Sequence, residues 1–427
     1  MIFEIEAQNT GPIENLSMKF GERLNLITGD NGLGKSFILD LVWFSLTRQW
    51  PQAVNKSLLS GEMIRPRDAY KEASITSEFK CVAGNAKPKI IFNKDADLWQ
   101  FPQGQPPSGG MVFYAMADGC FAFWDPMRNR NAADVDRVTP AFVFNSKEIF
   151  DGLPGESGGW LCEGLIKDWV FWQASNYFKD DFEIFKNILN VLSSEDSKLV
   201  PGDPRPVSPA DIRLIPTINM DYQVDVPIIH ASSGVKRIVS LAYLLVWALY
   251  GHKRAAKARG KEPDNRLTFL FDEVECHLHP KWQRKIIPAL INVSKLLTKD
   301  LTKDASIQFI ISTHSPLIMS SVEGEFDDQS DKWFDLDVID NKISLNQREY
   351  SALGDADNWL MSEAFNLKTS YSIRAEKILN KAKNLIKNKN LSNNQIKEMN
   401  KELSSVLSDT DPFWINWNAL TYKLNYD

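Results

Sequence analysis

The segment that most constrains the fold is Gly29–Ser36, which fits the pattern GxxxxGK[ST] in full. An apolar run at 24–28 precedes it, and apolar residues at helical spacing follow from 35 to about 50. The pattern needs this strand–turn–helix order, because glycines let backbone amides close around phosphate oxygens and the start of the helix adds its dipole. A chance match in an ordinary glycine turn is the alternative, and the flanking strand and helix argue against it.

The same segment predicts a site for ATP and Mg²⁺. Lys35 would reach the β- and γ-phosphates and take part in catalysis, and the Ser36 hydroxyl would ligate the metal ion. The residues predicted to bind the nucleotide in this segment are Asn31, Gly32, Gly34, Lys35, Ser36 and Phe37.

A second motif is the apolar run 267–271, which ends in the acids Asp272 and Glu273. In a P-loop protein this is the Walker B pattern. Asp272 would hold Mg²⁺ through its water shell, and Glu273 would orient or deprotonate the attacking water. A pair of solvated acids at a strand end is the alternative, and the complete P-loop makes it the weaker one.

The five histidines include two candidate sites. The segment 276–279 reads Cys-His-Leu-His, but it lacks a distant second ligand pair, and a helix is expected from Pro280, so a turn is favoured over a metal site. His314 follows a predicted strand at 308–312. We expect it to contact the γ-phosphate, although Ser and Thr before Pro also suit a helix-capping turn.

Strand and helix alternate at both ends of the chain, which predicts an α/β core. The 427 residues suffice for two or three packing units, and four scattered cysteines exclude a disulfide scaffold and a zinc ribbon. We predict an N-terminal lobe with the P-loop and a strand-rich part, a helical insertion, a lobe with the acids and His314, and a helical C-terminal extension. These parts span 1–145, 146–229, 230–350 and 351–427.

Hydrophobic periodicity predicts the individual elements. Strands are expected at 2–7, 16–20, 24–28, 73–81, 111–114, 120–124, 267–271 and 308–312, and helices at 35–50, 161–177, 181–192, 236–250, from 280, and across 358–426. Trp169, Trp172 and Gln173 share one helix and are expected in the core rather than in a site.

The net charge of −6 excludes a globally basic nucleic-acid binder, although it leaves room for local basic patches. Such patches are a basic loop at 252–261 and the lysine-rich tail, which would be solvated faces or contacts for nucleic acid or an acidic protein. No signal peptide is recognised, and the longest apolar run, 238–250, is too short to cross a bilayer. A cytoplasmic protein without membrane contact is therefore expected.

The order of the P-loop, the segment Ser232–Arg237, the acids at 272–273 and His314 resembles the ABC-type ATPases of the RecF/SMC/OLD-like group. It is most similar to bacterial stand-alone ATPases of anti-phage systems, such as the Septu, PARIS and retron-linked ATPases. The likeness covers most of the chain and includes 15–17, 150–153, 164–173 and 240–248.

The resemblance implies an ABC-type ATPase head in which the signature segment of one protomer closes over the ATP of the other. Ser232, Ser233 and Gly234 would then contact the nucleotide of a second copy, in a homodimer or a higher homo-oligomer. Ser233 stands where relatives such as SMC proteins have glycine, so closure would be weaker or slower. A plain N-cap for the following helix is compatible with this role. Lys236 and Arg237 would meet an acid or a phosphate, or form a solvated pair.

The resemblance also implies ATP hydrolysis by the sensor or regulatory subunit of an anti-phage system, which controls a co-encoded effector such as a nuclease or toxin. The alternative is a DNA repair or genome-maintenance ATPase that acts on DNA directly. A nuclease activity of this chain itself is disfavoured, because no carboxylate cluster is seen beyond the ATP site.

Overall fold

The computed structural model describes residues 1–424 except 83, 103–107, 130–138, 156–157, 194–197, 221–223, 302–304, 366 and 388–391. Two compact units are formed by Met1–Trp359 and Leu360–Asp427. The first unit contains two sheets and a group of helices. The second unit is helical.

The central sheet of the first unit has the strand order β10-β9-β8-β16-β17-β3-β18-β19. Five neighbouring strands are parallel, namely β8 (Met111–Ala115), β16 (Arg266–Phe271), β17 (Ser306–Ser312), β3 (Leu24–Gly29) and β18 (Lys332–Ile339). Every residue of β3 and β16 is buried, as expected for strands covered on both faces. The α/β class is confirmed.

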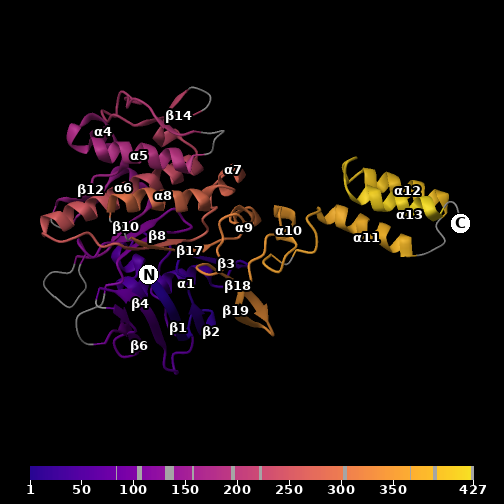
Figure 1. The fold of residues 1–427 in the computed structure, drawn as a ribbon, viewed down its shortest axis with the longest axis horizontal. Coiled ribbons are helices and arrows are strands. Elements are labelled where there is room, and N and C mark those ends of the chain that lie inside the picture. Colours follow the sequence, from indigo (N-terminus) through magenta and orange to yellow (C-terminus); the bar gives the residue numbers. More distant parts are fainter. Residues whose placement is uncertain are drawn as a thin grey trace. The chain divides into compact units, whose positions relative to one another are not determined.

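Antiparallel strands complete both edges of this sheet, with β9 (Phe121–Trp124) and β10 (Phe142–Phe144) on one side and β19 (Lys342–Arg348) on the other. The second sheet is antiparallel, with the order β2-β1-β4-β6-β7 and β5 paired to β4. Its strands are β1 (Ile2–Thr10), β2 (Ile13–Lys19), β4 (Ser74–Cys81), β5 (Gly84–Ala86), β6 (Lys89–Asn93) and β7 (Leu98–Gln100). Figure 1 shows these N-terminal strands at one end of the unit and the helices at the other.

Helix α1 (Lys35–Thr47) joins the two sheets through one apolar core. Its Ile38 and Trp43 are fully buried, and the same core includes Ile5 from β1 and Leu270 from β16. The helix ends at Thr47, three residues before the predicted end, because Arg48 adopts a left-handed C-cap conformation. The short helix α2 (Pro51–Val54) follows. The P-loop helix is thus fixed by packing on both sides.

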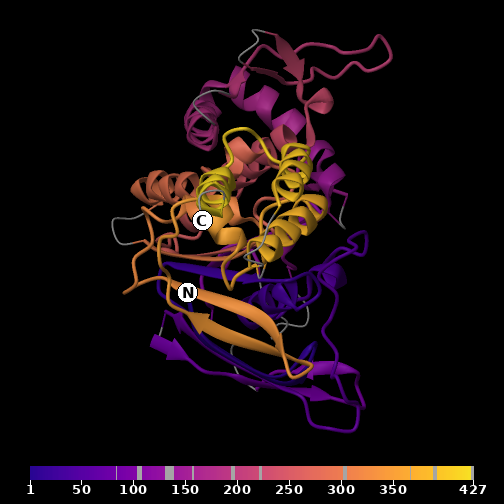
Figure 2. The same ribbon diagram turned by 90° about the vertical axis from the view of Figure 1, so that its right-hand side faces the viewer.

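The helical part contains α3 (Ser146–Asp151), α4 (Leu165–Ala174), α5 (Lys179–Leu192), α6 (Ser233–Ala258), α7 (Pro280–Gln283), α8 (Ile286–Leu301) and α9 (Pro316–Ser321), with 3₁₀ turns at Asn176–Phe178 and Ile228–His230. Small antiparallel sheets pair β11 (Leu153–Pro154) with β12 (Trp160–Cys162), and β14 (Thr217–Asn219) with β13 (Val200–Pro201) and β15 (Asp225–Pro227). Figure 2 shows the magenta helices and the indigo strands at opposite ends of this unit.

The predicted helix 161–177 is wrong at its start. Residues 160–162 pair as strand β12, and the helix begins only after Gly164, whose φ is 89°. The expectation for its aromatic residues is confirmed, because Trp169 and Trp172 are buried and pack edge-on against Phe185.

The predicted basic loop at 252–261 is also wrong over most of its length, because α6 continues to Ala258. Cations near a helix C-terminus interact favourably with the carbonyl end of the helix, so Lys257 suits this last turn. Arg254 also pairs with Asp181 at 2.6 Å. Helix α6 is long and apolar enough to cross a membrane, but 72% of its apolar window is buried inside the protein, as in the core helix of a globular domain.

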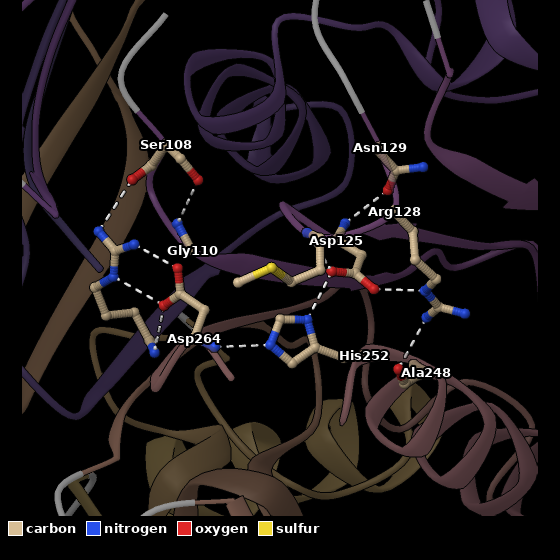
Figure 3. Close-up of polar contacts among 10 residues, drawn as sticks. Ser108, Gly110, Asp125, Arg128, Asn129, Ala248, His252 and Asp264 are labelled. Atoms are coloured by element: carbon tan, nitrogen blue, oxygen red, sulfur yellow. Dashed lines mark hydrogen bonds and ion pairs between the residues drawn. The ribbon is translucent and has the colours of Figure 1, made fainter. Parts of the chain in front are cut away.

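A buried polar network ties the end of α6 to the central sheet (Figure 3). The Asp264 amide donates to Nε2 of His252 at 2.8 Å, so Nδ1 of His252 carries the proton and donates to Asp125 at 2.6 Å. Arg128 also binds Asp125, and it donates to the Ala248 carbonyl at 2.8 Å. The charges of this buried cluster are therefore paired.

The second unit contains α11 (Ile373–Lys387), α12 (Asn393–Ser404) and α13 (Phe413–Leu424), and α10 (Ala356–Leu360) lies where the two units meet in the chain. Its core is formed by Leu379, Ala382, Met399, Leu403, Leu407 and Trp417. The predicted helical tail is confirmed for these four helices, whereas the described residues at 361–365, 367–372 and 405–412 are not helical.

Candidate nucleotide-binding site

The P-loop backbone has the conformation that its glycines permit. Gly32 and Gly34 have φ angles of +80° and +102°, which residues with a Cβ rarely adopt. At Gly34 a Cβ would also lie 2.7 Å from Cγ of Pro12. The glycine therefore lets the turn pass under Pro12 and enter α1 at Lys35.

Lys35 is buried inside this loop. Its Nζ donates to the carbonyls of Gly29 (2.8 Å) and Asp30 (2.9 Å). Burial lowers the pKa of Lys35, and the nearby carboxylates of Glu273 and Asp272 oppose this effect. The ammonium group is thus held at the end of β3, beside the acids at the end of β16.

Asp272 lies at the end of β16 and is almost completely buried. The Ser312 hydroxyl, at the end of β17, donates to its Oδ1 at 2.7 Å. Burial raises the pKa of Asp272, whereas hydrogen bonds from Ser312 and Ser36 and the charge of Lys35 lower it. Ser36 and Asp272, the two predicted metal ligands, therefore lie together. Hard oxygen ligands of this kind suit Mg²⁺.

Glu273 has a left-handed backbone with φ of 47°, which is uncommon for a residue with a side chain. Its amide donates to the Ser312 hydroxyl at 2.8 Å, which holds this turn against β17. The side chain is 37% exposed, and its Oε1 lies 3.6 Å from Nε2 of His314. Burial and the charge of Lys35 lower the pKa of His314. His314 therefore faces Glu273. The alternative of a capping turn is also present in this segment, because Ser315 occupies the N-cap position of α9, although without a side-chain cap hydrogen bond.

Glu275 is a site residue that the sequence analysis missed. Its carboxylate accepts hydrogen bonds from the Thr313 hydroxyl at 2.8 Å and from the His314 amide at 2.5 Å. Burial raises the pKa of Glu275, and these hydrogen bonds oppose the effect. Glu275 thus fastens the segment that carries His314 to the turn that carries Glu273.

The segment Ser232–Gly234 lies at the start of α6. Ser232 is the N-cap, and its Oγ accepts from the Val235 amide at 3.4 Å, so the capping interpretation holds. Ser232 and Ser233 are exposed. A Cβ on buried Gly234 would lie 2.7 Å from the His277 carbonyl oxygen. Within the described residues, no hydrogen bond or ion pair joins this segment to the P-loop.

Two further predictions concern packing and metal binding. The Phe37 ring lies over Gly11 and is partly buried against the core. His279 caps α7 by accepting from the Lys281 amide at 3.3 Å. Among the described residues, no group of three or more His, Cys, Asp or Glu side chains could hold a metal ion.

Arg237 donates to the carbonyls of Met116 (3.1 Å) and Ala117 (3.5 Å), so its partners are backbone groups rather than an acid. These carbonyls directly follow β8, whose Ala115 accepts a hydrogen bond from the Asp272 amide at 2.9 Å. The first turn of α6 is therefore linked to the chain that supports Asp272.

Comparison with known proteins places both halves of this site in described families. Residues 4–105 match a family described as an AAA domain, and residues 169–320 match one described as AAA domain, putative AbiEii toxin, Type IV TA system. The first range contains the P-loop, and the second contains the signature segment, the acids and His314.

Individual relatives are more distant. The Septu protein PtuA of Bacillus thuringiensis is 23% identical over 323 residues, which are 74% of this chain and 72% of that protein. The retron Vc95 probable ATPase of Vibrio cholerae serotype O1 biovar El Tor is 45% identical over 56 residues, only 13% of this chain and 9% of that protein. An SMC head, solved bound to the C-winged helix domain of ScpA, aligns at 15% identity and a TM-score of 0.45 over 82% of this chain and 98% of that chain. The chain is a P-loop ATPase with AAA-type domains, related to Septu PtuA and to retron ATPases.

Proposed function

We propose that the chain hydrolyses ATP with Mg²⁺ in a head-to-tail dimer and acts as the regulatory subunit of an anti-phage defence system. The observation that carries the ATP chemistry is the convergence of Lys35, Asp272, Glu273 and His314 at the carboxyl ends of three adjacent parallel strands. Ligands of open α/β sheets bind at this edge.

The proposed role of each residue follows from the chemistry of its side chain. Ser36 and Asp272 would hold Mg²⁺, which would neutralise charge on the phosphates when bound. Glu273 is the more exposed acid of the pair, so it can reach a water molecule, and His314 beside it can contact the γ-phosphate. Catalysis would consist mainly of positioning and electrostatic stabilisation.

The dimer is supported by the exposed hydroxyls at the start of the signature segment Ser232–Arg237. Ser232 and Ser233 are exposed at the start of a long helix, where a hydroxyl and free amides suit a phosphate. No described hydrogen bond joins them to the P-loop of the same chain. A second copy would supply the missing half of each site, which gives two composite sites per dimer.

The defence role is supported by the relatives, whose names are a Septu protein and retron ATPases. In this proposal the ATP state of the dimer restrains or releases a co-encoded effector, such as a nuclease or toxin. A DNA-acting ATPase is the second candidate. Helix α11 favours it, because five of its residues are basic and one is acidic: Arg374, Lys377, Lys381, Lys383 and Lys387, against Glu376.

The decisive experiment measures the ATP turnover rate and the oligomeric state of the full chain and its variants. Lys35→Ala should abolish turnover, whereas the exposed-lysine control Lys94→Ala should leave it unchanged. Glu273→Gln should bind ATP and form a dimer detectable by light scattering. Normal turnover in Lys35→Ala would refute the site assignment, and a Glu273→Gln protein that stays monomeric with ATP would refute the composite site.

A separate experiment distinguishes the two roles. Turnover is measured with and without duplex DNA, and the chain is then used to capture the product of a neighbouring reading frame. Stable capture without DNA stimulation supports effector control. Stimulation that disappears in the double variant Lys377→Gln, Lys383→Gln supports direct action on DNA.

A further inference from the structure

Four aromatic side chains pack against one another near the end of the first unit: Phe326, Trp333, Tyr350 and Trp359. The rings of Phe326 and Tyr350 stack with their centroids 4.1 Å apart. Trp359 is the last residue of the unit and is fully buried. Its ring meets Trp333 edge-on at 5.7 Å and lies 5.3 Å from Tyr350. Aromatic pairs attract one another at such separations, so the four rings hold each other in place.

The indole of Trp333 reaches the strand that leads into the P-loop. Its Nε1 donates to Oγ1 of Thr28 at 2.8 Å, and that hydroxyl donates in turn to Oδ1 of Asp335 at 2.8 Å. Thr28 directly precedes Gly29, whose carbonyl accepts from Nζ of Lys35 at 2.8 Å. The indole therefore fixes the end of β3 at the residue from which the P-loop starts.

The phenol of Tyr350 reaches α9, the helix that follows His314. Its hydroxyl donates to the Met319 carbonyl at 2.5 Å. Helix α9 begins at Pro316, two residues after His314, and has only six residues. It is therefore about 9 Å long, so a shift of its last turn is passed on to its first turn. Tyr350 thus holds the segment that carries His314 from the helix side.

Glu323, two residues beyond α9, ties the same helix to Trp359. Its Oε1 accepts from Nε1 of Trp359 at 2.7 Å and from the amides of Leu353 and Gly354 at 2.9 and 3.0 Å. Hydrogen bonds to an ionised carboxylate are stronger than those between neutral groups. Trp359 is therefore bonded to the α9 side and packed against the indole that holds Thr28, so its position affects both.

We propose that two rings of this cluster are positioning residues for ATP hydrolysis. Trp333 acts on the P-loop through Thr28. Tyr350 acts on His314 through α9, and Trp359 keeps both rings in place. This inference rests on the proposed function, because it assumes that the P-loop binds ATP and that His314 acts on the γ-phosphate. The two branches differ in their kinetic effects: a displaced P-loop weakens ATP binding, whereas a displaced His314 lowers kcat at unchanged affinity.

The test uses substitutions in the full chain that remove one hydrogen bond and keep most of the packing. Trp333→Phe and Thr28→Val both remove the bond between the indole and the hydroxyl. Each should raise the Kd for the fluorescent analogue mant-ATP by about 3–10-fold, as expected for the loss of one hydrogen bond. Tyr350→Phe removes only the phenolic hydroxyl. It should lower kcat by about 3–10-fold and leave the Kd unchanged.

The matched control is Trp99→Phe, which removes an indole hydrogen bond of the same length in the second sheet. Trp99 is buried on β7, and its Nε1 donates to the Ile64 carbonyl at 2.8 Å. The control should lower the urea midpoint about as much as Trp333→Phe does, but keep native values of Kd and kcat. Thr28→Ser retains the hydroxyl and should bind mant-ATP like the native chain. Circular dichroism verifies that all variants are folded.

The outcomes that overturn the proposal differ between the branches. Native Kd values in both Trp333→Phe and Thr28→Val, or an equal rise in the control, refute the positioning of the P-loop. A native kcat in Tyr350→Phe, or a loss of equal size when His314→Ala is already present, refutes the positioning of His314. If His314→Ala alone keeps the native kcat, the proposed role of His314 fails, and the Kd values still decide the role of Trp333.

Discussion

Glu275 is predicted to act on ATP hydrolysis through His314. Glu275→Ala removes the acceptor of both the Thr313 hydroxyl and the His314 amide. An unsatisfied buried donor costs about 1–3 kcal/mol, so the segment that carries His314 loses its anchor. A displacement of about 1 Å at a catalytic group can cost roughly 100-fold in rate. We therefore expect kcat to fall about 10–100-fold, with KM for ATP changed less than about threefold because the P-loop is untouched.

A double-mutant cycle decides whether Glu275 works through His314. If it does, adding Glu275→Ala to His314→Ala should reduce kcat little further, because the residue that it positions is already gone. Glu275→Gln keeps one acceptor oxygen and should retain an intermediate kcat. Losses that multiply in the double variant, or a change confined to KM, would refute the positioning role.

Three further predictions concern stability and nucleotide binding. Burial raises the pKa of Asp168 to about 6, although Tyr243 donates to it at 2.6 Å. The folded chain therefore binds more protons than the unfolded chain between about pH 4 and 6, and stability falls as pH rises through this window. Asp168→Asn should remove up to about 3 kcal/mol of this penalty above pH 6, seen as a rise in Tm that is absent near pH 4. Gly34→Ala should abolish mant-ATP binding, because the φ of +102° and the 2.7 Å approach to Pro12 leave no room for a Cβ; binding of native strength would contradict this. Trp169→Ala should cost about 3–5 kcal/mol in urea unfolding, and a loss below about 1 kcal/mol would show that the aromatic cluster is not a core.

Local patterns in the sequence predict the central features well. The P-loop, the strand before Asp272 and the strand before His314 each combine an apolar run with a short polar motif, and all three lie where the patterns place them. Their meeting point is also predictable, because the carboxyl ends of neighbouring parallel strands share one sheet edge.

Other features depend on contacts that a local pattern does not contain. Glu275 binds residues 313 and 314, and Ser312 bridges Asp272 and Glu273 from the next strand, so both roles exist only after the sheet has formed. The continuation of α6 past residue 250 was missed because a basic run indicates either a loop or a favourable helix end. The strand at 160–162 was missed because its partner is only two residues long.

The position of β3 has a consequence for how the chain folds during synthesis. This strand carries the P-loop, yet its two neighbours are β17 and β18, which come roughly 300 residues later. At about 5–20 residues per second, a ribosome needs roughly 15–60 s to deliver them. Until then both backbone edges of an apolar strand lack partners, which invites wrong pairing or aggregation. The P-loop is therefore synthesised long before the strands that hold it in place. Nascent chains stalled before β18 should be captured by chaperones and should fail to retain ATP.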